Sequence, residues 1–284
     1  MNNSDQPIYI DYAMQSCDVK TYQSTTDRFC GNDRTLLSKK SLKSFLQSVK
    51  YCADQVDNVV HRIAIFDDNC TEDLRAFRAK CIEQFSSDSI KIQVINLPGQ
   101  PTPFQGIRES IRECYLWLQE HGEDLVYQIQ DDYMFDKAAI YEMVDVWQQM
   151  FQETDSHAVI SPWNDPDLWA ATAPDGYRNR ASQRTVVPGK HRYWIQYYDC
   201  SCSFLTSHKQ FSQHWDLYND FFYLIDKIDK TDGLLEQRSL NYMFVKRGIL
   251  GLVPINSLAW HMQQIDDRDP YIPWEPIWDA IDVT

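Results

Sequence analysis

Residues 125–133 read LVYQIQDDY, a short run of β-favouring residues that ends in two adjacent carboxylates and an aromatic ring. Successive side chains of an extended chain point to opposite faces, so Asp131 and Asp132 face different ways. If the run is a central strand, one carboxylate leaves its C-terminal end towards a ligand, and the other turns back to hold a loop or a ribose hydroxyl. Open α/β sheets bind ligands at that edge, and hard divalent cations select oxygen donors. The alternative is a polar strand end with two capping aspartates.

The composition of the 284 residues is that of a globular protein, with 43% hydrophobic and 13% aromatic side chains. No signal peptide and no apolar run of membrane-spanning length is visible, so we expect a cytoplasmic protein without a transmembrane segment. The eight cysteines include no C-x-x-C pair, which favours reduced thiols. Cys200 and Cys202 have the spacing of one strand face, and a soft-metal site is the alternative.

The net charge of −14 argues against a nucleic-acid or anionic-membrane partner, because both require a basic surface. An acidic protein that handles a phosphorylated ligand needs a local cation, either a metal ion or a cluster of Arg and Lys. Both are available in this sequence.

The first half of the chain alternates expected strands with expected helices. Strands are expected at residues 19–25, 61–66, 90–97 and 125–130. Amphipathic helices are expected between them, the first capped at Asn32 or Asp33, the second at Asn69 or Thr71, and the third beginning near Gln105. This order predicts an α/β fold with a mostly parallel central sheet and helices on both faces.

The second half is less regular. We expect a helix capped by Asp136, strands at 158–163, 194–206 and 250–260, and helices at 209–218, at 221–227 and from about Leu235 to a stop at Gly248. Without a repeat or a low-complexity linker, residues 1–261 are predicted to form a single domain. It has a nucleotide-binding half at about 19–135 and an acceptor-side half at 136–261, followed by an acidic C-terminal tail at 262–284.

Several nucleotide-binding motifs are absent. No G-x-G-x-x-G and no G-x-x-x-x-G-K-[ST] occurs in a chain with only nine glycines. A sugar nucleotidyltransferase is expected to carry a Gly-rich loop after its first strand, whereas residues 25–34 contain one glycine. That weakens the nucleotidyltransferase interpretation without excluding it.

In this order the motifs resemble nucleotide-sugar-dependent glycosyltransferases of the GT-A fold, compact and stand-alone members of a bacterial or phage type. The resemblance extends over about residues 19–261. Residues 65–73, IFDDNCTED, are similar to the second-strand segment whose aspartate reads the nucleoside base, which implies that role for Asp68. Residues 129–133, IQDDY, resemble the acidic metal motif called D-x-D, with Gln130 at its first acidic position.

The resemblance implies a metal-dependent transferase of the EC 2.4 class with a UDP-sugar favoured as donor. Because Gln130 replaces the first acid, it points to Asp132 as the Mn²⁺ or Mg²⁺ ligand, with Asp131 serving the ribose or the loop. Residues 259–261, AWH, resemble the C-terminal histidine of a metal or diphosphate site, which implies His261 as second ligand. Oxygen and imidazole donors suit these ions.

The remaining expected site residues come partly from the same resemblance and partly from the basic and aromatic residues of the second half. Residues 233–241 resemble the acidic helix start that supplies the base of inverting members, which implies Glu236 as catalytic base with Asp232 as its competitor. Further expected contacts to the nucleotide sugar are Thr25, Arg28, Lys190 and Arg192, the last two from a basic stretch at 177–193 that contains no acid and is expected to close as a lid. Trp163 and Trp194 are expected to stack on an acceptor sugar.

Each assignment has a structural alternative. His261 would be a core histidine, the basic stretch a solvated loop, each tryptophan a core residue, and Glu236 an acid that favours the positive end of its helix. Two other functions also remain open, a sugar nucleotidyltransferase and a catalytically inactive relative that binds a nucleotide or carbohydrate.

Overall fold

The computed structural model describes residues 6–19, 33–98, 103–164, 184–198, 203–219, 240–262 and 268–283, without the side chains of 103–108 and 245. The strands in these ranges are β1 (Ile8–Ser16), β2 (Val59–Asp67), β3 (Ile90–Asn96), β4 (Leu125–Ile129), β5 (Tyr133–Phe135), β6 (Val159–Ile160), β7 (Val186–Pro188), β8 (Tyr193–Tyr197), β9 (Phe204–Ser207), β10 (Gly251–Pro254) and β11 (Ala259–His261). The helices are α1 (Arg34–Gln55), α2 (Glu72–Phe85), α3 (Pro103–His121), α4 (Ala139–Thr154), α5 (His208–Gln213), α8 (Tyr242–Lys246) and α9 (Trp274–Ala280).

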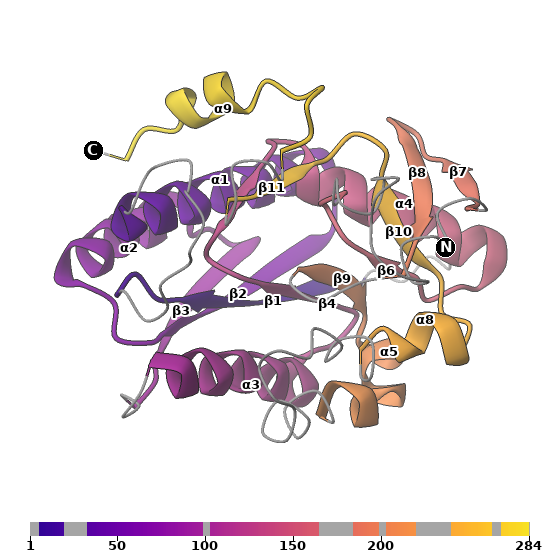
Figure 1. The fold of residues 1–284 in the computed structure, drawn as a ribbon, viewed down its shortest axis with the longest axis horizontal. Helices are drawn as coiled ribbons and strands as arrows, with labels where there is room; N and C mark the ends of the chain where they lie inside the picture. Colours follow the sequence, from indigo (N-terminus) through magenta and orange to yellow (C-terminus); the bar gives the residue numbers. More distant parts are fainter. Residues whose placement is uncertain are drawn as a thin grey trace, which may run out of the picture.

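Nine of the described strands form one sheet in the order β3-β2-β1-β4-β9-β6-β10-β8-β7. Strands β1 to β4 are mutually parallel, and β6 and β10 continue their direction on the far side of the antiparallel β9. Helices α1, α2 and α4 cover one face of the sheet, and α3 and α5 cover the other (Figure 1). The predicted α/β class, with a mostly parallel sheet and helices on both faces, is confirmed.

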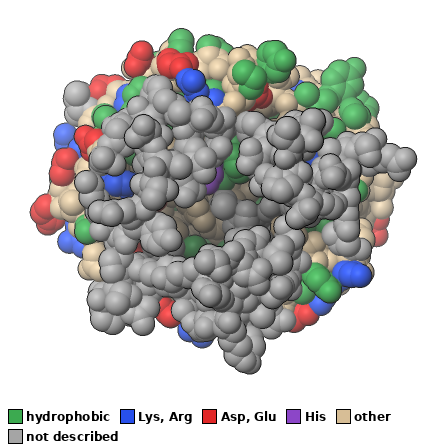
Figure 2. Space-filling view, in the orientation of Figure 1, with side chains coloured by type: hydrophobic (Ala, Val, Ile, Leu, Met, Phe, Trp, Pro, Cys, Tyr) green, Lys and Arg blue, Asp and Glu red, His purple; other side chains and the backbone are tan. Residues whose placement is uncertain are grey.

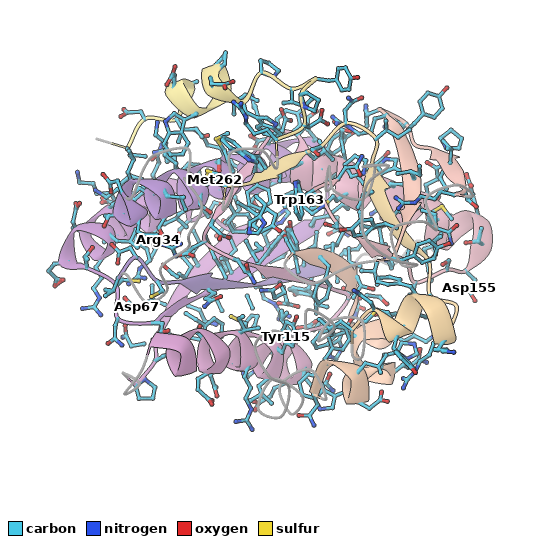
Figure 3. All side chains as sticks on the ribbon, in the orientation of Figure 1. Arg34, Asp67, Tyr115, Asp155, Trp163 and Met262 are labelled. Atoms are coloured by element: carbon cyan, nitrogen blue, oxygen red, sulfur yellow. The ribbon has the colours of Figure 1, made fainter. Side chains whose placement is uncertain are left out.

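Alternation along β1 divides the core into two layers. Ile10, Tyr12 and Met14 pack with α1, α2 and α4, whereas Ala13 packs with α3. Figure 3 shows the same division, with Met262 and Trp163 above the sheet and Tyr115 below it. Both faces of the central strands are therefore covered, as parallel sheets require.

The first strand lies earlier than the sequence predicts. We expected it at residues 19–25, but β1 is Ile8–Ser16, and residues 20–32 lie outside the described part of the chain. β1 contains Asp11, which is fully buried and is bound by Arg62 of β2, with Nε 2.6 Å from Oδ1 and Nη2 2.8 Å from Oδ2. The loop that follows the first strand therefore begins at Cys17 and not near Thr25.

The C-terminal segment is part of the folded domain. It carries α9, whose Trp274 and Trp278 pack with Leu37 of α1 and Trp260 of β11. Lys40 of α1, 7% exposed, donates from Nζ to the main-chain oxygens of Trp278 (2.6 Å) and Ile281. The predicted tail at 262–284 thus folds back on α1.

Two predictions about the class of protein can be compared with the described residues. Five cysteines there, Cys17, Cys52, Cys70, Cys81 and Cys114, are buried and form no disulfide with one another. None of the described helices is long and apolar enough to cross a membrane.

Candidate functional site

The two carboxylates at the end of β4 have different surroundings, as the alternation of an extended chain predicts. Asp131 turns back towards the loop after β1, where its Oδ2 accepts hydrogen bonds from Cys17 N (2.7 Å) and Ser38 Oγ (3.0 Å). Asp132 faces the other way, and its Oδ2 lies 3.4 Å from Nε2 of His261. Asp131 therefore holds a loop, and Asp132 is the carboxylate presented to the site.

Burial dominates the electrostatics of Asp131. Removal from water raises the pKa of its carboxyl to about 6, a shift that the guanidinium of Arg34 opposes and the charge of Asp132 increases. Arg34 Nη2 lies 3.9 Å from Asp131 Oδ1 and donates to the main-chain oxygen of Cys17 at 3.2 Å. Of the two roles expected for Asp131, the structure favours the loop over the ribose.

His261 reaches Asp132 because β11 pairs with β5. In this antiparallel pair His261 lies opposite Tyr133, and Met262 N donates to the main-chain oxygen of Asp132 at 2.8 Å. The imidazole stacks on the Tyr133 ring at 4.6 Å between centroids and meets the edge of Trp163 at 5.2 Å. Two aromatic rings thus fix the orientation of a histidine that is 6% exposed.

The donors of this pair fit a divalent cation. Two protein ligands that each lie about 2.0–2.2 Å from one ion are separated by roughly 3 Å, close to the 3.4 Å between Asp132 Oδ2 and His261 Nε2. His261 Nε2 is buried and makes no hydrogen bond to any residue that the structure describes, so it is suited to bind a ligand. Among the described residues, no group of three or more His, Cys, Asp or Glu side chains could hold a metal ion. The described residues would therefore supply two ligands to such an ion.

The end of β2 carries the second pair of aspartates. Asp67 is bound by Arg75 (Nε to Oδ2, 2.9 Å), by Arg78 and by the main-chain N–H of Cys70 (2.9 Å). Burial alone would raise the pKa of Asp67, but the hydrogen bonds from the two arginines outweigh it and hold that pKa well below its usual range. The carboxylate of Asp67 is thus occupied by hydrogen bonds that attach α2 to the end of β2.

Asp68 is the member of this pair that is open to a ligand. It is 4% exposed, and no hydrogen bond or ion pair to its carboxylate is found within the described ranges. Burial, with a contribution from the charge of Asp67, raises its pKa. A buried carboxylate in this position is suited to a ligand's N–H or O–H donors, so the expected role in base recognition stays a prediction.

One residue at the same edge was missed by the sequence analysis. Asp18, just after β1, accepts from Thr71 N (2.7 Å) and from the hydroxyls of Thr35 (2.7 Å) and Thr71. It ties the first loop to the N-termini of α1 and α2. The misplaced first strand hid this role, since an aspartate directly after a correctly located strand is a recognisable signal.

The structure places the two expected acceptor tryptophans differently. Trp163 is partly buried and lies against Tyr133 and His261. Trp194 is 1% exposed and packs in the core of the sheet. A ring buried to this extent presents no face to an acceptor, so the assignment of Trp194 is corrected to a core residue.

The basic stretch is in part a hairpin. Its described portion forms β7 and β8 at the edge of the sheet, where Arg192 is ion-paired with Glu142 of α4 and donates from Nη1 to the main-chain oxygen of Asn256 at 2.8 Å. Arg192 would have to leave Glu142 to reach a diphosphate, so its position argues against a lid residue. Lys190 lies exposed in the turn of this hairpin.

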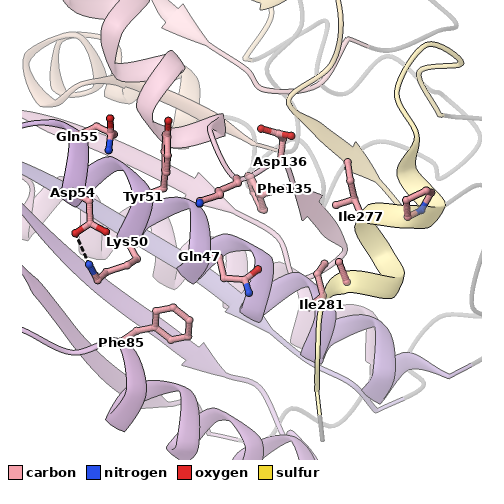
Figure 4. A pocket seen from close by; sticks show the side chains of 13 residues that line it. Gln47, Lys50, Tyr51, Asp54, Gln55, Phe85, Phe135, Asp136, Ile277 and Ile281 are labelled. Atoms are coloured by element: carbon pink, nitrogen blue, oxygen red, sulfur yellow. Dashed lines mark hydrogen bonds and ion pairs between the residues drawn. The ribbon is translucent and has the colours of Figure 1, made fainter.

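The other predicted site residues, Thr25, Arg28, Asp232 and Glu236, lie outside the described residues. Figure 2 shows a histidine side chain near the centre of the view, in the orientation of Figure 1. A separate pocket of about 740 Å³ lies between α1, the start of α4 and α9 (Figure 4). Asp54, Tyr51 and Ile277 are among its lining residues, and none of the predicted site residues lines it.

Comparisons with known proteins give no family for this chain. No protein-family model matches it, and no curated protein matches its sequence. Among solved structures it is similar to a UDP-glucose pyrophosphorylase complexed with UDP-glucose (6% identity over 96% of this chain and 98% of that chain, TM-score 0.48) and to the apo form of a UDP-glucose pyrophosphorylase (7%, 95% and 97%, 0.48). It is also similar to an active-site mutant of LgtC (14%, 85% and 72%, 0.42). With TM-scores of 0.42 to 0.48 and identities of at most 14%, these likenesses carry no argument, and function is argued from the site.

Proposed function

We propose that this chain is a metal-dependent glycosyltransferase that moves a sugar from a nucleoside-diphosphate sugar, with UDP favoured, to an acceptor hydroxyl. The observation that carries the proposal is the buried pair formed by Asp132, just after β4, and His261 of β11. The imidazole Nε2 lies near the carboxylate and makes no hydrogen bond to a described residue. Mn²⁺ or Mg²⁺ held there would supply a Lewis acid for the departing diphosphate.

The chain's own residues then divide the work. Asp68 would accept hydrogen bonds from the base, Thr25, Arg28 and Lys190 would contact the donor, and Trp163 would support the acceptor sugar. Asp131 would keep the first loop in place through Cys17 N.

The proposed catalytic base lies in the second half of the chain. Glu236, with Asp232 as its competitor, would take the proton of the acceptor hydroxyl as general base. Displacement in a single step would then invert the anomeric centre.

Calorimetry of UDP binding with and without Mn²⁺ tests the proposal. Asp132→Asn keeps the shape of the side chain and removes its charge, so we expect it to weaken the metal-dependent binding of UDP by about 100-fold or more. Asp88→Asn is the matched control, because it removes the same charge from an exposed side chain in the turn before β3. Equal Mn²⁺-dependent binding by the wild type and Asp132→Asn would contradict the proposal.

The released product separates the related functions. A glycosyltransferase releases UDP from a UDP-sugar, whereas a sugar nucleotidyltransferase forms or consumes pyrophosphate. An inactive relative binds the donor without turnover.

A further inference from the structure

Helix α1 buries two stripes of different chemistry. One is apolar and faces the sheet, with Leu42, Phe45, Leu46, Val49 and Cys52. The other consists of Ser38, Ser41, Ser44 and Ser48, all at most 2% exposed, and we call it the serine seam. Serine favours a helix less than alanine does, so four buried serines at helical spacing weaken α1 unless their hydroxyls have a task.

Three hydroxyls of the serine seam bond to the chain that carries Asp132. Ser38 Oγ donates to Asp131 Oδ2 at 3.0 Å, before β5. Ser44 Oγ accepts from Phe135 N at 3.2 Å, within β5, and Ser48 Oγ accepts from Ile140 N at 2.9 Å, in the first turn of α4. Asp132, the candidate metal ligand, therefore lies between two residues that are hydrogen-bonded to α1, Asp131 and Phe135.

The geometry of β5 explains why α1 provides an acceptor. Asp132 and Asp136 direct main-chain groups to β11, since Met262 N donates to Asp132 O and Asp136 N donates to Leu258 O, each at 2.8 Å. Main-chain groups alternate in direction along a strand, so the N–H of Phe135 points away from β11 and towards α1. A buried N–H without a partner is unfavourable, and Ser44 supplies the acceptor that a neighbouring strand would otherwise provide.

The Ser44 hydroxyl both accepts and donates a hydrogen bond in this arrangement. While its oxygen accepts from Phe135 N, its proton is donated to the main-chain oxygen of Ser41 at 3.0 Å. Ser41 differs, because its own Oγ is buried and has no hydrogen-bond partner among the residues that the structure describes. The seam therefore contains three serines that bond to other groups through their hydroxyls and one that serves as an internal control.

We propose that Ser38, Ser44 and Ser48 are positioning residues that set the location of the Asp132 carboxylate relative to His261. They act through Asp131 and the main chain of β5 and α4 and touch no ligand themselves. The consequence for metal and donor binding rests on the proposed function, whereas the ordering of the chain around Asp132 does not.

The test compares Ser44→Ala, Ser48→Ala and their double variant with Ser41→Ala. Each substitution removes one hydroxyl from the same buried face of α1. Hydrogen exchange of peptides that cover residues 129–140 is measured without metal. We expect the amides of Asp132, Tyr133 and Met134 to exchange about fivefold faster in Ser44→Ala and faster still in the double variant, and at the wild-type rate in Ser41→Ala.

The affinity for Mn²⁺ in the presence of UDP provides the second measurement, made by calorimetry at a temperature where circular dichroism shows every variant to be folded. We expect an affinity about tenfold weaker for the double variant and unchanged for Ser41→Ala. A purely structural role would lower the free energy of unfolding and leave this affinity intact. That result would overturn the proposal, and the single variants keep it testable if the double variant does not fold.

The two measurements separate failure of the inference from failure of the proposed function. If the wild type binds no Mn²⁺ with UDP, the proposed function fails, and the exchange rates alone decide the positioning role. If exchange at Asp132, Tyr133 and Met134 is the same in Ser44→Ala, Ser48→Ala and Ser41→Ala, the positioning role is wrong whether or not metal binds.

Discussion

Strands β2 and β4, which lie on either side of β1, both lead into a pair of adjacent aspartates and use it in the same order. At the end of β2, Asp67 is bound by α2, whereas the carboxylate of Asp68 has no hydrogen bond or ion pair within the described ranges. After β4, Asp131 is bound by the first loop and α1, and Asp132 lies beside His261. In both pairs the first aspartate has a structural role, and the second is the one that we propose meets a ligand. The alternation of side chains in an extended chain accounts for this division.

The pairs differ in how the structural aspartate is held. Asp67 is bound by two arginines, one of them buried, and its pKa lies well below the usual range. Asp131 is bound by neutral donors with one guanidinium at 3.9 Å, and burial raises its pKa to about 6. The charge of Asp67 therefore contributes to stability, whereas the charge of Asp131 opposes folding at neutral pH.

The largest expected effect is on Asp67. Asp67→Asn leaves Arg78, which is 4% exposed, with a buried and uncompensated charge, so we expect a loss of about 3–5 kcal/mol in the free energy of unfolding. The folded pKa is depressed, so this contribution is present above the unfolded pKa of about 3.9 and is lost only as the pH falls through the folded pKa. Urea denaturation at pH 5, 6, 7 and 8 should give a constant deficit. A deficit no larger than that of Asp88→Asn would show that the arginines do not need the charge.

Asp131 should behave in the opposite way with pH. Its folded pKa of about 6 lies above the unfolded value of about 3.9, so its contribution to stability is full below pH 3.9 and is lost as the pH rises through 6. Asp131→Asn has no charge to bury and keeps an oxygen that accepts from Cys17 N and Ser38. We expect its stability relative to the wild type to increase by up to about 3 kcal/mol between pH 4 and pH 7. The comparison is made by denaturation in a chelator, and a difference independent of pH would contradict the raised pKa.

The smallest effect concerns Asp68 and the identity of the nucleotide. An acceptor placed for one base is left unpaired by another, which costs about 1–3 kcal/mol. We expect the wild type to bind UDP more tightly than ADP and Asp68→Asn to lose most of that preference, with Asp88→Asn as the control. Calorimetry that finds equal wild-type affinity for the uridine, adenosine, guanosine and cytidine diphosphates would remove Asp68 from base recognition.

Local patterns were sufficient to predict much of the nucleotide-side half. The strands at 61–66, 90–97 and 125–130 agree with β2, β3 and β4 within two residues at each end. Asp33 and Thr71 cap α1 and α2 through Leu36 N and Leu74 N as expected. In the acceptor-side half, Gly248 likewise has the positive φ of 68° typical of a residue just after a helix. In each case the residues that decide the structure are neighbours in the sequence.

The elements that were missed depend on distant partners. β1 contains Asp11, an unfavourable strand residue until Arg62 of β2 neutralises it. β5 has only three residues. Its main chain is hydrogen-bonded to β11 on one side and to the Ser44 hydroxyl of α1 on the other. Trp194 is buried by its position in the sheet, which no local pattern encodes.

The candidate site was predicted in part. The opposite directions of Asp131 and Asp132 followed from alternation, and the approach of His261 to Asp132 was implied by the resemblance and agrees with the 3.4 Å separation. Which aspartate of the β2 pair is structural was foreseeable from Arg75 and Arg78, which lie three residues apart on one face of the following helix. The partner of Arg192 could not be predicted, because Glu142 belongs to α4 and lies 50 residues earlier in the chain.

The attachment of the C-terminal segment by Lys40 has an evolutionary consequence. Its ammonium donates to the main-chain oxygens of Trp278 and Ile281, and every amino acid provides such an oxygen. Substitutions at these two positions leave both acceptors in place, so selection can act on Lys40 without acting on the side chains it meets through these bonds. The same ammonium also lies over the Trp278 ring, 5.1 Å from its centroid, so only the two main-chain bonds would escape a search for co-varying residue pairs.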